Sequence, residues 1–153
     1  MQVLGEKGLS GMVKLLLDGV FIGGMAIFIT LPWCLNIAFD LIKSAIDENY
    51  YFLLGFFYFS GLFALCLVYE IRKIFKNLNK RTPFTMDNVK SLKRMAFASF
   101  IITGAYAVKI IFYPSILTII MAMVFVILGL FLIILAEVFH QAVIVKEEND
   151  LTI

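Results

Sequence analysis

Five ionisable side chains are expected at a common depth, near one end of the long apolar segments of this chain. They are Asp18, Glu70, Arg94, Glu137 and His140. Charged groups in or beside hydrocarbon usually face the interior of a helix bundle and pair with one another. Two interpretations are open: a layer of ion pairs that fixes how the helices are rotated, or a histidine that responds to protons.

Metal and catalytic chemistry are disfavoured. The spacing Glu137-x-x-His140 resembles that of carboxylate-bridged metal sites in helical bundles, but those sites need several Glu ligands and two such pairs, and this chain has 1 His. The sequence also has no phosphate-binding glycine loop and no nucleophile with a His partner. We therefore expect no catalytic residue, no metal site and no cofactor, and a protein that is not an enzyme.

The elements that must position these side chains are apolar helices. Hydrophobic residues make up 62% of the 153 residues and charged residues 16%, too little polar surface to cover a water-soluble protein of this size. Apolar runs long enough to cross a hydrocarbon layer of about 30 Å lie at 19–39, 50–69, 95–113 and 116–136. The sequence therefore predicts an all-α, polytopic membrane protein, with a single four-helix transmembrane bundle over residues 1–153. Pro32 should kink the first helix.

Basic residues follow the second apolar run directly. Eight of them fall between residues 70 and 95: Arg72, Lys73, Lys76, Lys80, Arg81, Lys90, Lys93 and Arg94. Short segments rich in Lys and Arg stay on the cytoplasmic side of a membrane. With an even number of spans, both termini should then be cytoplasmic as well.

Helices 2, 3 and 4 should continue beyond the bilayer. Apolar residues recur at helical spacing from Ile71 to Leu78, residues 79–83 should end that helix, and Thr85 should cap the next one. Residues 70–94 are thus predicted to form a cytoplasmic helical hairpin, and residues 137–153 a cytoplasmic C-terminal helix and tail. The acidic tail either folds back onto the hairpin lysines as a latch or is a solvated, frayed end.

The turn and the tail carry a resemblance to a known family. The stretch from Asn77 to Val89 and the closing residues 147–153 resemble the YoaS-like proteins, bacterial four-helix membrane proteins of unknown function that are often encoded beside a small Xre/Cro-type helix-turn-helix regulator. The matching positions are Pro83, Phe84, Thr85, Asn88, Asn149, Asp150, Leu151 and Thr152. The resemblance assigns them no catalytic role. It implies a protein of the bacterial inner membrane that works with a DNA-binding protein.

Three functions remain open. The first, which we favour, is a regulatory scaffold or sensor that binds a cytoplasmic partner, such as a helix-turn-helix regulator, through its basic hairpin and C-terminal tail. The second is a small transporter or channel subunit completed as a homo-oligomer, although the apolar centres of the spans disfavour a solute pathway. The third is binding of anionic lipids of the bilayer by the eight cations. Direct contact with nucleic acid is not expected so close to a membrane.

Overall fold

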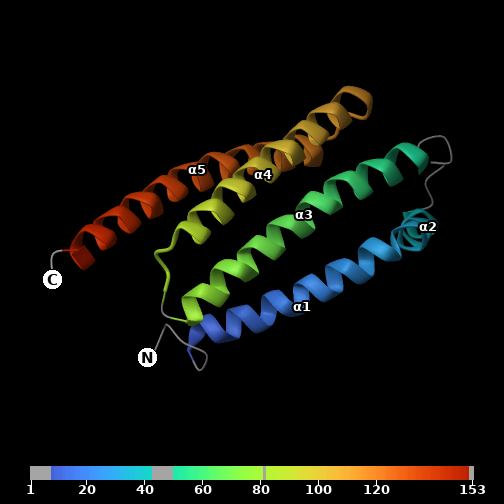
Figure 1. Ribbon diagram of the computed structural model, residues 1–153. Helices are drawn as coiled ribbons and strands as arrows, with labels where there is room; N and C mark the ends of the chain where they lie inside the picture. The colour runs from blue at the N-terminus through green and yellow to red at the C-terminus, as the bar shows by residue number, and fades with distance from the viewer. Residues whose placement is uncertain (1–7, 43–49, 81, 152–153) are drawn as a thin grey trace.

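The computed structural model describes residues 8–42, 50–80 and 82–151, and the statements on structure below concern these residues. They form five helices and no strand, which confirms the all-helical prediction (Figure 1). The helices are α1 (Leu9–Ile29), α2 (Leu31–Ile42), α3 (Tyr50–Asn79), α4 (Met86–Phe112) and α5 (Ile116–Leu151). Four of them, α1, α3, α4 and α5, are long and apolar enough to cross a membrane.

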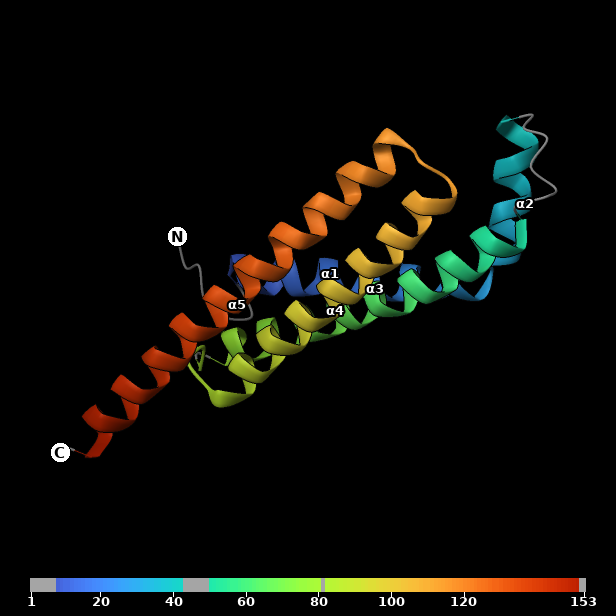
Figure 2. The ribbon, with the colours of Figure 1, turned by 90° about the horizontal axis from the view of Figure 1, so that it is seen from above.

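The first membrane helix differs from the expected span 19–39. It begins at Leu9 and ends at Ile29, and α2 turns sharply away from it (Figure 2). The break lies at Thr30, whose backbone N–H and hydroxyl both donate to the Ala26 carbonyl, at 3.0 and 2.8 Å. Pro32 is the second residue of α2, where its missing N–H costs no helical hydrogen bond. In place of the expected kink within one helix there are thus two helices, and α1 alone is the candidate membrane span.

The four long helices lie in a row in the order α1, α3, α4, α5. Helix α1 packs on α3, α3 on α4, and α4 on α5, whereas no close backbone approach joins α1 to α5 within the described residues. Figures 1 and 2 show the resulting open, curved bundle. At about 1.5 Å per residue, α3, α4 and α5 are roughly 45, 40 and 54 Å long. Each exceeds a hydrocarbon layer of about 30 Å.

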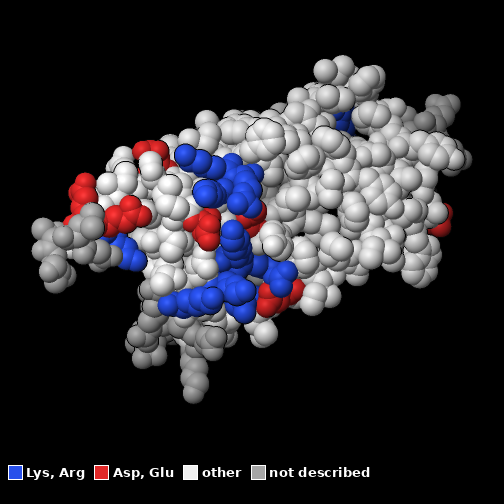
Figure 3. All heavy atoms as spheres, viewed as in Figure 1, with Lys and Arg blue, Asp and Glu red and all other residues white. Residues whose placement is uncertain are grey.

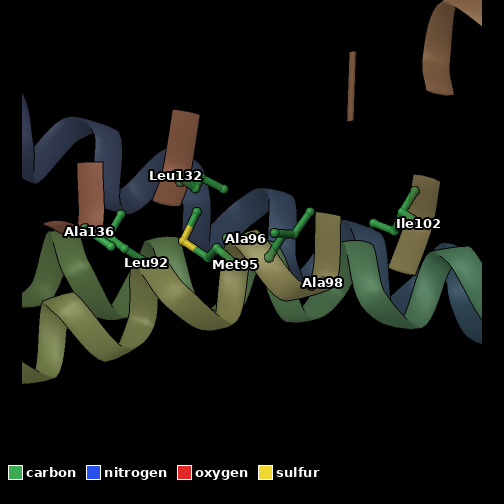
Figure 4. Close-up of a cluster of buried hydrophobic side chains, with 8 residues drawn as sticks. Leu92, Met95, Ala96, Ala98, Ile102, Leu132 and Ala136 are labelled. Atoms are coloured by element: carbon green, nitrogen blue, oxygen red, sulfur yellow. The ribbon is translucent and has the colours of Figure 1, made fainter. Parts of the chain in front are cut away.

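The best-buried apolar cluster lies between α4 and α5. Leu92, Met95, Ala96 and Ile102 of α4 pack there against Leu132 and Ala136 of α5, with Leu67 of α3 beside them (Figure 4). The two alanines are almost completely buried, with 2% and 0% of their surfaces exposed. Small residues allow helix backbones to approach closely, and this packing is what holds helices together where lipid is as apolar as the side chains.

Candidate functional site

Lys and Arg side chains gather at one end of the molecule (Figure 3). This charged end consists of the start of α1, the end of α3, the linker 80–85, the start of α4 and the last turns of α5. The rest of the face in Figure 3 is almost free of charge. The end forms because α3 and α4 are antiparallel neighbours joined by a short linker, so basic residues on both helices meet at the same level.

The linker is held by side chains from both helices. Thr85 caps α4, as expected, and its hydroxyl accepts a hydrogen bond from the Asn88 N–H at 3.4 Å. Asn88 itself is completely buried. Its Nδ2 donates to the Pro83 carbonyl at 2.6 Å, and its Oδ1 accepts from Asn77 Nδ2 of α3 at 2.7 Å. The Asn88 side chain thus clamps the two helices and the linker together.

Phe84 and Asn149, two of the family-motif positions, lie on one surface. The Phe84 ring is 5.5 Å from the ring of Phe139, measured between centroids. Phe84, Val145 and Asn149 line a recess of about 420 Å³ between the linker and α5. The linker and the last turns of α5 thus form one continuous surface.

The acidic tail is the continuation of α5. The helix runs without interruption to Leu151, so Asp150 and Leu151 close it instead of turning back toward the hairpin. Thr152, the last of the family-motif positions, lies outside the described residues. As far as Leu151, the tail is therefore neither a folded-back latch nor a frayed end but part of a helix that projects from the bundle (Figure 2).

The five ionisable residues expected at one depth form separate pairs rather than one layer. Arg94 Nη1 donates to Glu70 Oε1 at 2.8 Å and joins α4 to α3. Asp18 Oδ1 accepts from Arg72 Nε at 2.6 Å and joins α1 to α3. The third contact stays within α5, where His140 Nδ1 and Glu137 Oε1 are 4.0 Å apart.

Arg72 has a different place from the one expected. It belongs to the eight cations expected to bind a partner or lipid headgroups, but besides its bond to Asp18 it lies over the Phe21 ring of α1, with Cζ 4.5 Å from the centroid. Arg72 and Arg94 therefore connect helices. No local pattern reveals this role, because Asp18 and Arg72 are far apart in the sequence.

The remaining cations of the set are available at the surface. Lys73, Lys76, Lys80, Lys90 and Lys93 form no ion pair with any residue that the structure describes. All but the half-buried Lys73 are exposed. Arg81 lies outside the described residues. Seven of the eight expected cations are thus divided between two helix-connecting arginines and a set of five lysines.

Glu70 is the most constrained charge of this end. It is buried, and its Oε2 has no hydrogen-bond partner within the described part of the chain. The guanidinium side chain of Arg94, its one ion-pair partner there, is 56% exposed. A buried carboxylate is costly unless it is paired, so the position of Glu70 depends on Arg94.

Three hydroxyl groups in the apolar parts of α3 and α4 form hydrogen bonds within their own helices. The hydroxyls of Ser60, Ser99 and Thr103 donate to carbonyls of their own helices at 2.7, 2.9 and 3.0 Å. Across residues 8–42, 50–80 and 82–151, no group of three His, Cys, Asp or Glu side chains is placed to hold a metal. The charged end is therefore the strongest candidate for a functional site.

Comparison with known proteins identifies a family. The family model described as "Protein of unknown function (DUF2975)" matches residues 9–153. The match begins at the first residue of α1 and covers all five helices. No curated protein and no solved structure matches the chain.

Proposed function

The chain belongs to the DUF2975 family of proteins of unknown function, and we propose that it is a non-enzymatic regulatory scaffold that binds a cytoplasmic protein through its charged end. In this proposal the charged end faces the cytoplasm of a bacterial cell, and both termini lie on that side of the inner membrane. The gathering of Lys and Arg at one end of the spans supports this orientation.

One observation carries the proposal: a set of lysines, with no ion-pair partner among the described residues, sits on two helices that side chains join together. Lys76, Lys90 and Lys93 are exposed on helices α3 and α4, whose ends the Asn88 clamp holds together. An array of cations that is held in place favours a partner with a complementary acidic surface. Arg72 and Arg94 contribute to the scaffold rather than to the binding surface, because they are already paired.

The proposed partner is a helix-turn-helix regulator. This rests on the resemblance of the linker and tail to the YoaS-like proteins, whose genes often lie beside such a regulator. The recess lined by Phe84 and Asn149 adjoins the lysines and would add an apolar contact to the charged ones. Binding would hold the regulator at the membrane.

The test is recruitment of the neighbouring regulator. The full-length protein and the tagged regulator are produced together, and the membrane-bound fraction of the regulator is measured. We expect the triple variant Lys76→Glu, Lys90→Glu, Lys93→Glu to reduce that fraction at least about tenfold, since close charge pairs at interfaces contribute roughly 1.5 kcal/mol or more each. The matched control replaces the same lysines with Arg, which keeps the charge, and should recruit normally.

Two outcomes would contradict the proposal: recruitment by the triple Glu variant at the wild-type level, or a regulator that stays soluble beside the wild-type protein. Anionic-lipid binding is the competing use of the same lysines, each of which would contribute about 1 kcal/mol near a charged surface. Lipid binding predicts that the triple Glu variant changes the enrichment of anionic lipid around the protein and leaves the membrane-bound fraction of the regulator unchanged.

A further inference from the structure

An apolar groove runs between α3 and α4 at the end of the molecule opposite the charged end. Its volume is about 700 Å³, and its lining includes Phe52, Gly55 and Phe59 of α3 and Ile101, Gly104 and Val108 of α4. Both helix segments belong to candidate membrane spans. The groove therefore opens toward hydrocarbon rather than toward water.

Two glycines on facing helices keep this groove open. A Cβ atom built on Gly55 or on Gly104 would meet no atom within 4 Å. These glycines thus do not serve close helix packing, unlike Gly129, where a Cβ would lie 2.9 Å from Phe100 Cζ. An unfilled groove loses dispersion contacts along its whole lining, so an apolar occupant is expected.

A cation, Lys109, reaches one residue of the groove lining, although it is not itself part of that lining. Lys109 Nζ is 4.9 Å from the centroid of Phe56, which lines the groove, and 5.9 Å from that of Phe57. It forms no ion pair with a carboxylate of the described residues. Lys109 is the one Lys or Arg between Arg94 and Lys146. An ionisable residue within a membrane helix is by default a candidate functional group.

We propose that this groove binds an anionic phospholipid of the leaflet opposite the charged end, with an acyl chain along Gly55 and Gly104 and the phosphate at the Lys109 ammonium. The depths agree. Lys109 lies one turn before α4 ends at Phe112, where a flexible lysine reaches the headgroup level. From there the groove runs along Val108, Gly104 and Ile101, about 10 Å toward the centre of the bilayer.

The charge of Lys109 favours a lipid over a second copy of the chain. A two-fold dimer within a membrane has its axis along the membrane normal, so a dimer packed through this groove would bring both Lys109 side chains to the same depth near the axis. Two like charges held close together repel each other. An anionic headgroup instead complements the ammonium.

The test counts the lipids that remain on the purified full-length protein. The protein is equilibrated with mixed micelles of phosphatidylglycerol and phosphatidylcholine in equal amounts, and bound lipid is identified by native mass spectrometry. We expect the wild type to hold more phosphatidylglycerol than phosphatidylcholine. Because the lysines of the charged end also attract anionic headgroups, the result is the change in this ratio: Lys109→Gln should lower it about fivefold, the preference that one cation near a headgroup supplies, and Lys109→Arg should keep it.

Groove-filling variants test the acyl-chain site separately. Gly55→Leu and Gly104→Leu should each remove the bound lipid, whereas Gly23→Leu, at an equally open position on α1, should not. Thermal unfolding and gel filtration show that each variant is folded, and the two glycines serve as independent tests. Retention of lipid by both folded groove-filled variants, a preference unchanged in Lys109→Gln, or a dimer that these variants convert to a monomer would overturn the proposal. The charged end is unaltered throughout, so the outcome is independent of regulator recruitment.

Discussion

Individual residues of the charged end fall into two groups, those that build the scaffold and those that present charge. Thr85 could be identified as a helix cap from sequence because capping depends on neighbouring positions. The partner of Asn88 could not, because Asn77 belongs to another helix. Five lysines remain at the surface without ion pairs among the described residues, while Arg72 and Arg94 join helices.

Removing the Asn88 clamp should destabilise the hairpin. Asn88→Ala leaves the Pro83 carbonyl and the Asn77 amide without their partner, and an unsatisfied buried polar group costs about 1–3 kcal/mol. The free energy of unfolding is measured in mixed micelles by titration with a denaturing detergent. Lys90→Ala, an exposed position on the same helix, serves as the control and should change stability by no more than about 0.5 kcal/mol. Equal effects of the two substitutions would refute the clamp.

The Glu70–Arg94 pair should respond asymmetrically to substitution. Arg94→Ala leaves an ionised carboxylate buried without a donor, at a cost of roughly 3 kcal/mol. Glu70→Gln removes the buried charge and leaves an arginine that water can reach, so its cost should be smaller. The same unfolding titration compares the two variants. A larger loss for Glu70→Gln would show that the burial of Glu70 does not depend on Arg94.

At the scale of elements, the close approach of α4 and α5 holds the bundle together. Ala96 and Ala136 lie in this interface, and Gly129 of α5 faces the edge of the Phe100 ring. Hydropathy predicted the existence of these helices but not their contact, because Gly129 and Phe100 look like ordinary residues of two apolar runs. The boundary of α1 also differs from the one that hydropathy predicted, because the helix ends at Ile29 and Pro32 lies in the first turn of a separate helix, α2.

Gly129→Ala should separate α4 from α5. The new Cβ would come within 2.9 to 3.1 Å of three Phe100 ring atoms, and overpacking of this kind typically costs about 1–3 kcal/mol. Phe100→Leu in the same chain should recover most of the loss, as measured by thermal unfolding. Gly104→Ala, where a Cβ meets nothing, should be neutral or slightly stabilising. If Phe100→Leu gave no recovery, the contact between ring and backbone would not be the cause.

At the scale of the whole molecule, one end of the row of four long helices is charged, and the rest of the face in Figure 3 is almost free of charge. The bundle is open, because α1 packs on α3 alone among the long helices that the structure describes. The positive-inside rule predicts which end is cytoplasmic, because the rule depends on the charges of short segments and not on the packing of helices.

Accessibility labelling tests this orientation. In a variant with Cys34 and Cys66 replaced by Ala, single cysteines are introduced as Ser115→Cys or Lys80→Cys, both at exposed positions. A membrane-impermeant maleimide should label Ser115→Cys in intact cells and Lys80→Cys only after permeabilisation. The reverse pattern would place the charged end outside the cell and remove the basis of the cytoplasmic partner.

The sequence by itself determined that the chain is all-helical, that four apolar segments can cross a membrane, that one connection is strongly basic and that Thr85 caps a helix. Each of these follows from composition or from neighbouring residues. The tertiary structure decided that Asp18 pairs with Arg72, that Asn88 joins α3 to α4, and that a groove opens at Gly55 and Gly104 beside Lys109. These depend on how distant helices are rotated and spaced, which is set by the packing of side chains between them.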